Sequence, residues 1–224
     1  SPAWGASNRK LYNLFPVSSE NDIFRVDNAD TSDFVATIAS IGTNTVVYNN
    51  PSSGNENTIN VSSQNQLGKI VLHNTTRGSE ALISHVDMAT NTITLVGDVP
   101  PDWQMGDTIT ARSQTNTSLV ATSGYFFDID MSGVLSPTTA AIVLALTLLD
   151  SAATTPYPCL VHPYEANAAG KRQGVNPQVA GRAVRRTVFL PIIERRFCLG
   201  WVASGNGTDT IVLRLAGILE EAAK

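Results

Sequence analysis

The stretch Val86-Asp87-Met88-Ala89-Thr90-Asn91-Thr92-Ile93-Thr94-Leu95 contains the clearest fold signal in this chain. Ile93 and Leu95 alternate with Thr92 and Thr94, and this period of two is typical of a half-buried strand. The turn-forming segment Ala89-Thr90-Asn91 comes directly before that strand. The pattern therefore predicts an antiparallel hairpin over residues 81–96.

Further short strands surround the hairpin. Thr45–Tyr48, Ile70–Leu72 and Thr108–Thr110 are rich in β-branched residues, which favour strands. The stretch Val99–Asp107, with two prolines and a glycine, predicts a tight corner. Residues 36–115 are therefore predicted to form a small antiparallel β-barrel or sandwich.

The second half of the chain has longer and more apolar strand patterns, led by Ala141–Leu149, Val184–Ile193 and Thr210–Leu219. Several carry apolar residues on both parities, which predicts that one face packs in a core and the other in a subunit interface. Ser136-Pro137 also fits a helix start, but the following segment has no polar stripe, so a strand is favoured. We predict a jelly-roll-like β-sandwich over residues 119–224, separated from the first domain by a polar connector at 112–118.

Residues 1–35 show no sustained period. Scattered apolar residues punctuate the segment, and we expect it to be an extended arm that lays some of them on a partner surface. These candidate anchors are Trp4, Leu11, Tyr12, Leu14 and Phe15. An ordinary first strand with a loose lead-in is the alternative that the sequence leaves open. With either reading, the fold class is all-β.

The composition limits the function classes. The 224 residues are 42% hydrophobic and only 15% charged, with a net charge of −4. A disordered chain needs low hydrophobicity and high charge, so this composition argues against disorder. A nucleic-acid binder is usually basic overall, so the negative net charge argues against that class. The longest apolar run is too short to span a bilayer. Cys159 and Cys198 lie in apolar runs, which predicts buried thiols, although the sequence leaves a single bridge open.

Candidate catalytic groups are sparse. The chain has no nucleotide-binding fingerprint or nucleophile elbow. His73 and His85 could meet across strands, but no third ligand for zinc is evident. Asp128 and Asp130 share one face of a strand, where a solvated or interface-facing edge is a simpler interpretation than a carboxylate pair. We therefore predict no enzymatic activity, no cofactor and no metal.

A basic cluster is the strongest charge feature. Between residues 171 and 196 the chain has seven basic residues and one acid, a local charge of 7 − 1 = +6, which leaves −10 for the rest. We expect this cluster to pair with acidic regions of other copies of the chain, or to dock on the acidic surface of a partner. A merely solvated loop and a nucleic-acid contact are the alternatives. The candidate residues are Arg182, Arg185, Arg186, Arg195 and Arg196.

Two stretches carry a resemblance to tailed-bacteriophage virion proteins. Residues 86–95 with 103–109 resemble hairpins of such proteins, and residues 187–191 with 207–217 are similar to the last strands of jelly-roll domains in phage head and fibre proteins. The resemblance implies a non-enzymatic virion component, commonly a homotrimer. The arm and the absence of coiled-coil heptads favour a capsid cement or decoration protein. A fibre protein that binds a host glycan, or a carbohydrate-binding β module, are the alternatives.

Overall fold

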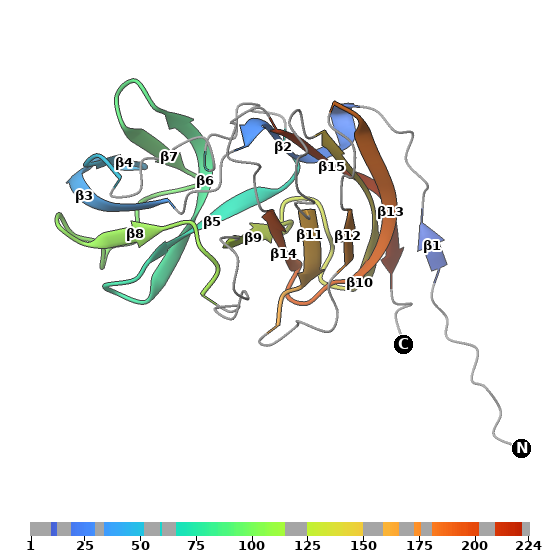
Figure 1. Cartoon of the computed structure of the whole chain (residues 1–224). Coiled ribbons are helices and arrows are strands. Elements are labelled where there is room, and N and C mark those ends of the chain that lie inside the picture. Colours follow the sequence, from blue (N-terminus) through green and yellow to red (C-terminus); the bar gives the residue numbers. More distant parts are fainter. Residues whose placement is uncertain are drawn as a thin grey trace, which may run out of the picture.

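The computed structural model describes most of the chain, and β-strands dominate the described parts (Figure 1). One short 3-10 helix, η1 (Ser19–Asn21), precedes the main strands. None of the described segments forms a helix long and apolar enough to cross a membrane. The predicted all-β class is confirmed. The described residues are 10–12, 19–29, 34–51, 59, 66–114, 125–149, 159–165, 173–175, 181–201 and 209–220.

Six antiparallel strands close into a small barrel. Their order around the barrel is β5-β6-β7-β4-β3-β8, and β8 pairs back with β5 to complete the ring. Closure leaves no free sheet edge in this part of the molecule. The strands are β3 (Val35–Ile41), β4 (Thr45–Tyr48), β5 (Lys69–Asn74), β6 (Ser79–Asp87), β7 (Thr92–Leu95) and β8 (Thr108–Thr110).

The predicted hairpin is the β6–β7 pair. Asp87 lies opposite Thr92, so the turn falls between them, and Asn91 has the left-handed φ of 52° that such a turn requires. The Asp87 carboxylate accepts hydrogen bonds from the Ala89 backbone N–H at 3.0 Å and the Thr90 hydroxyl at 2.8 Å. These bonds lower the pKa of Asp87 and stabilise the turn.

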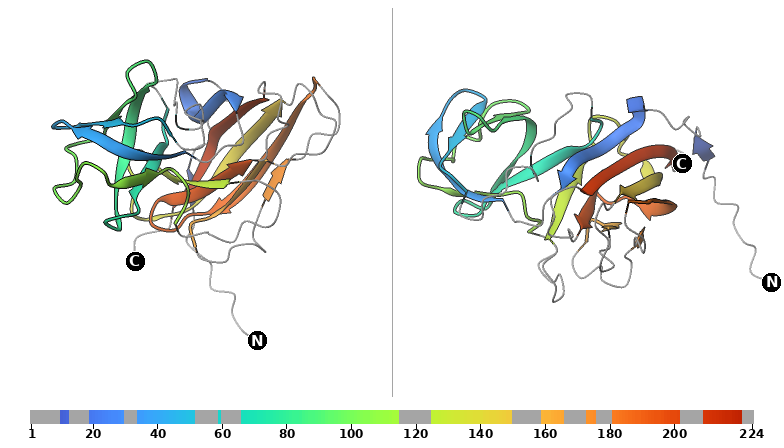
Figure 2. Two further views of the ribbon diagram at one scale, coloured as in Figure 1. Left: turned by 60° about the vertical axis from the view of Figure 1, so that its left-hand side comes forward. Right: turned by 45° about the horizontal axis from the view of Figure 1, so that its top comes forward.

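The remaining strands form a two-sheet sandwich beside the barrel (Figure 2). One sheet has the order β2-β15-β10-β13, with β1 (Lys10–Tyr12) also pairing with β15, and the other has β12-β11-β14-β9. This is a jelly-roll order, with the barrel inserted between the first two jelly-roll strands, β2 and β9. The strands are β2 (Asp22–Ala29), β9 (Tyr125–Asp130), β10 (Thr139–Leu149), β11 (Cys159–Pro163), β12 (Gln173–Val175), β13 (Ala183–Pro191), β14 (Arg196–Trp201) and β15 (Asp209–Glu220).

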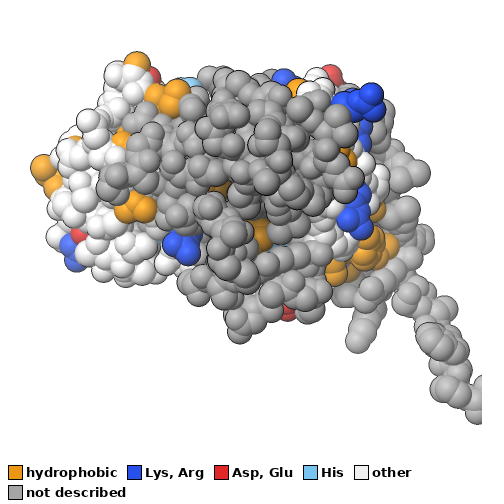
Figure 3. All heavy atoms as spheres, in the orientation of Figure 1, with side chains coloured by type: hydrophobic (Ala, Val, Ile, Leu, Met, Phe, Trp, Pro, Cys, Tyr) orange, Lys and Arg blue, Asp and Glu red, His pale blue; other side chains and the backbone are white. Residues whose placement is uncertain are grey.

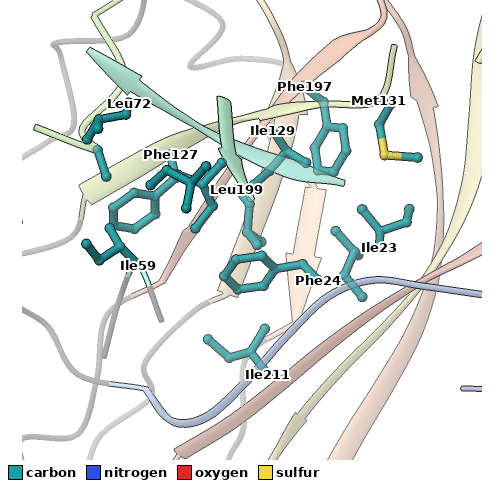
Figure 4. Close-up of a cluster of buried hydrophobic side chains, with 14 of the residues drawn as sticks. Ile23, Phe24, Ile59, Leu72, Phe127, Ile129, Met131, Phe197, Leu199 and Ile211 are labelled. Carbon is teal, nitrogen blue, oxygen red and sulfur yellow. The ribbon is translucent and has the colours of Figure 1, made fainter. Parts of the chain in front are cut away.

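Strand β5 joins the two parts. Lys69 and Ile70 pair with Asp130 and Ile129 of β9, while His73 pairs with Thr110 of β8. The first half of β5 therefore extends a sandwich sheet and the second half belongs to the barrel. The hydrophobic core is continuous across this junction, where Leu72 lies in one cluster with sandwich residues (Figure 4).

The N-terminal strand β2 is part of the sandwich. It pairs with β15, and the side chains of Ile23 and Phe24 are fully buried. These residues fall within the segment 1–35, for which we expect an arm and leave a first strand open as the alternative. For residues 22–29, the structure shows the alternative, a first strand, and the side chains of Ile23 and Phe24 complete the core between the two sheets.

Strand β10 adopts the strand rather than the helical alternative. Its even-numbered residues from Ile142 to Leu148 are buried, whereas Val143, Ala145, Thr147 and Leu149 are partly exposed. The buried side chains point into the sandwich, so the partly exposed ones lie on the outer face, defined here as the face of a sheet turned away from the opposing sheet.

Candidate functional site

A polar layer lies on the outer face of the sheet that contains β9 and β14. Asp128 is completely buried, and its Oδ2 lies 3.1 Å from Nε2 of His73, which β5 supplies. The Cys198 thiol donates to the other carboxylate oxygen, with Sγ 3.1 Å from Oδ1. Cys198 faces Asp128 because the two residues are paired across β14 and β9. The carboxylate thereby connects barrel and sandwich.

A second set of contacts continues the layer. Arg196 pairs with Asp130 across the same two strands, with Nε 3.0 Å from Oδ2, and its Nη2 donates to Glu80 of the barrel. Its guanidinium also lies over the Tyr164 ring, 5.5 Å from the centroid. Burial opposes the charge on Arg196, but the bonds to Glu80 and Asp130 outweigh this effect and raise its pKa. Arg196 thus links the sandwich to the barrel through ion pairs within the chain.

The buried thiol does not have the setting of a nucleophile. A reactive cysteine needs access and a lowered pKa. Cys198 is fully buried, and burial, together with the neighbouring Asp128, raises its pKa. His73 bonds to Asp128 rather than to the sulfur. Cys159 is likewise a buried free thiol whose pKa burial raises, so no bridge joins the two cysteines.

Two sequence-based expectations about this region need correction. His73 of β5 pairs with Glu80 of β6. His85 of β6 pairs instead with Thr94 of β7 and is exposed, so the two histidines do not meet. Asp128 and Asp130 do share one face, but that face is buried rather than solvated. Among the described residues, no group of three His, Cys, Asp or Glu side chains is placed to hold a metal ion.

The structure divides the predicted basic cluster. Arg182, Arg185 and Arg186 lie at the beginning of β13, while Arg195 and Arg196 lie at its far end, where the chain turns into β14. Arg196 is internal, as described above, and Arg186 donates to the Gly174 carbonyl of β12 at 2.8 Å. Arg195 is held near Ser132, whose carbonyl lies 3.4 Å from Nη1. Arg182 and Arg185 remain exposed.

Arg185 lines a surface depression of about 500 Å³ on the outer face of the β2-β15-β10-β13 sheet. The strand register places Thr147 of β10 opposite Arg185, and Ala145 between Thr187 and Arg214. Leu146 and Arg186 also line the depression, but the period of two turns their side chains toward the other face of the sheet, and the Arg186 guanidinium donates to Gly174 of β12. On the outer face, the depression is therefore lined by the guanidiniums of Arg185 and Arg214 and the hydroxyls of Thr147 and Thr187, with the small Ala145 between them.

Arg214 was not among the predicted site residues. Its Nε donates to Asp22 of β2, and its side chain is 26% exposed. The signal was present in the sequence, because Arg214 alternates with the buried Ile211, Leu213 and Leu215 and must point to the outer face.

The predicted arm anchors lie outside the described part of the structure. Trp4, Leu14 and Phe15 are outside the described residues, and for Leu11 and Tyr12 only the backbone of β1 is described. That backbone pairs with Leu219 and Ile218 of β15. The anchoring role of these five residues stays a prediction.

Comparisons with known proteins give little further guidance. No protein-family model and no curated protein matches this chain. Among solved structures, a match is an uncharacterized protein of Listeria monocytogenes EGD-e in complex with α-D-glucose, β-D-glucose, magnesium and calcium. The identity is 10%, the TM-score is 0.25, and the match covers 62% of this chain and 14% of that chain. A score this low supports no inference about the site.

Proposed function

We propose that this chain is a non-catalytic virion protein that decorates a capsid and binds its neighbours through the outer face of the β2-β15-β10-β13 sheet. Jelly-roll sandwiches serve as capsid and lectin domains, and the resemblance of two stretches to phage virion proteins favours the former. The proposal includes association of several copies, with a homotrimer as the expected state.

The observation that supports this proposal is the character of that outer face. An antiparallel sheet that faces water usually carries polar side chains on the wet side. Here the paired residues Val143 and Phe189 are apolar, and Phe189 is 49% exposed. Figure 3 shows hydrophobic and basic side chains next to one another over β13. Aromatic and arginine side chains together are typical of protein–protein interfaces.

The role in a particle can be tested by immunoelectron microscopy. Antibodies raised against the recombinant full chain would be applied to virus particles purified from the source culture. We expect label distributed over the capsid shell. Label confined to a fibre tip would favour the receptor-binding alternative and overturn the decoration role, and particles without label would overturn a virion role altogether.

The association of copies needs a separate measurement. Light scattering of the full chain during size-exclusion chromatography should give three times the monomer mass of 23.9 kDa. We expect Phe189→Glu to lower this mass while the circular dichroism spectrum stays unchanged, because a charge at an apolar interface is costly to bury. A wild-type monomer at all concentrations would contradict the trimer.

A further inference from the structure

We infer that the depression between Arg185 and Arg214 is a binding site for carboxylate side chains of an acidic protein segment. This inference deepens the proposed assembly role, on which it rests for its biological context, by naming the place and the chemistry of a partner contact. The strand register brings basic and hydroxyl groups from β13, β10 and β15 to one face of the sheet.

The two guanidiniums stand diagonally across β10. The ladder places Arg185 beside Thr147 and Arg214 beside Ala145, so their Cα atoms are about 12 Å apart by ordinary strand spacing. Between them lie the small Ala145 and the short Thr147, which leave the floor open. Two long side chains around a low floor can enclose a ligand from both sides.

The two arginines differ in how firmly they are held. Asp22 binds Nε of Arg214 and fixes that guanidinium beside the depression. The Arg185 side chain is exposed, and its guanidinium makes no hydrogen bond or ion pair with any described residue. No acidic residue is among the described residues that line the depression. Asp22 compensates the charge of Arg214, whereas no described residue compensates that of Arg185, so the described part of the depression keeps a positive charge that an incoming carboxylate can neutralise.

Guanidinium chemistry selects the type of ligand. The planar fork of arginine binds carboxylate or phosphate through two parallel hydrogen bonds. Thr147 and Thr187 add hydroxyl groups that can donate to the same anion. On the same face, the pair next to Ala145 and Thr187 along the two strands is Val143 with the half-exposed Phe189. Apolar side chains beside the cations favour a segment that is both acidic and apolar, as in a protein, over a bare phosphate backbone.

The site can be tested by isothermal titration calorimetry on the full chain in low salt. The probe is a capped hexapeptide of four glutamates and two leucines, and the control probe replaces every glutamate with glutamine. We expect binding of the acidic probe only. Arg185→Gln should weaken it at least about tenfold, since the variant loses the charge-assisted hydrogen bonds between the guanidinium and a glutamate.

Two further variants serve as controls. Arg182→Gln removes an exposed arginine that lies outside the depression, so we expect unchanged affinity. Arg185→Lys keeps the charge but loses the planar fork, so its affinity should fall between wild type and Arg185→Gln. High salt should weaken binding, because the Debye length shortens from about 10 Å at 0.1 M to 3 Å at 1 M.

Other outcomes would overturn the inference. These are equal losses in Arg182→Gln and Arg185→Gln, no binding of the acidic probe, or equal displacement of the probe by inorganic phosphate at the same charge concentration. Tighter binding of single-stranded RNA that also depends on Arg185 would assign the depression to nucleic acid. The peptide assay can fail while particle labelling succeeds, and the reverse, so the two proposals can be judged separately.

Discussion

Arg214 of β15 is ion-paired with Asp22 of β2, although 192 positions separate them in the chain. Asp22 begins the first sandwich strand and Arg214 lies within the last, so the pair joins the two ends of the fold. The Asp22 side chain is 7% exposed, and the Arg214 side chain is 26% exposed. The pair is therefore intermediate between an exposed and a buried salt bridge.

A double-mutant cycle with Asp22→Asn and Arg214→Gln should measure the coupling free energy of this ion pair. We expect a coupling of about 1–2 kcal/mol in the free energy of unfolding, because exposed pairs contribute up to about 1 kcal/mol and breaking buried pairs costs about 3–5 kcal/mol. Urea unfolding followed by circular dichroism would provide the four values. A coupling below about 0.3 kcal/mol would show that the two residues act independently.

Two phenylalanines offer a matched test of the place of β2 in the core. Phe24→Ala should destabilise the protein by about 3–5 kcal/mol, because Phe24 is fully buried and its removal leaves a cavity. Phe189→Ala removes the same group from a position that is half-exposed in a single chain. It should cost less than about 1 kcal/mol when unfolding is measured at protein concentrations where light scattering gives the monomer mass. Both are read from urea unfolding. Equal losses would mean that β2 does not pack as described.

The buried carboxylate of Asp128 should respond to small chemical changes. Asp128→Ala leaves His73 and Cys198 without their shared partner and should cost about 2–3 kcal/mol of unfolding free energy. Asp128→Asn keeps an oxygen acceptor for the Cys198 thiol and should cost less. The order of the two variants in a thermal or urea unfolding experiment is the check, and a neutral Asp128→Ala would contradict the polar layer.

The thiols should be unreactive in the folded protein. Burial raises the pKa of both Cys159 and Cys198, and the thiolate is the reactive form. With Ellman's reagent at pH 8, we expect no colour from the native chain and two equivalents after unfolding in guanidinium chloride. One or two rapid equivalents from native protein would disprove this burial.

The barrel should lose stability in acid through Asp107. The Arg77 hydrogen bond, with Nε 3.0 Å from Oδ2, chiefly lowers the pKa of Asp107 from 3.8 to about 2, and Asn74 assists. A carboxylate with a lowered pKa stabilises the fold above the unfolded value, and that contribution is lost as the pH falls from about 4 to 2. Asp107→Asn should therefore flatten the decline in urea stability over this window. An unchanged pH profile would refute the role.

The predictable parts of this fold are those with local causes. The β6–β7 hairpin follows from the alternation of Ile93 and Leu95 and from a turn in which Asn91 tolerates positive φ. The strand at Ala141–Leu149 follows from the absence of a polar stripe, and the outward direction of Arg214 follows from period two. Each of these properties depends on residues within a few positions of one another.

The tertiary structure alone decided which strands are neighbours. Strand pairing depends on the burial of side chains that are distant in sequence, and short-range patterns do not encode it. The tertiary structure places β2 beside β15 and buries Asp128 next to His73. Arg185 and Arg196 are close in sequence, but Arg185 lines a surface depression whereas Arg196 is in an internal ion pair. The local amino-acid pattern thus determined strands and turns, whereas the candidate site arose where non-local pairing brought Arg185 and Arg214 to one face.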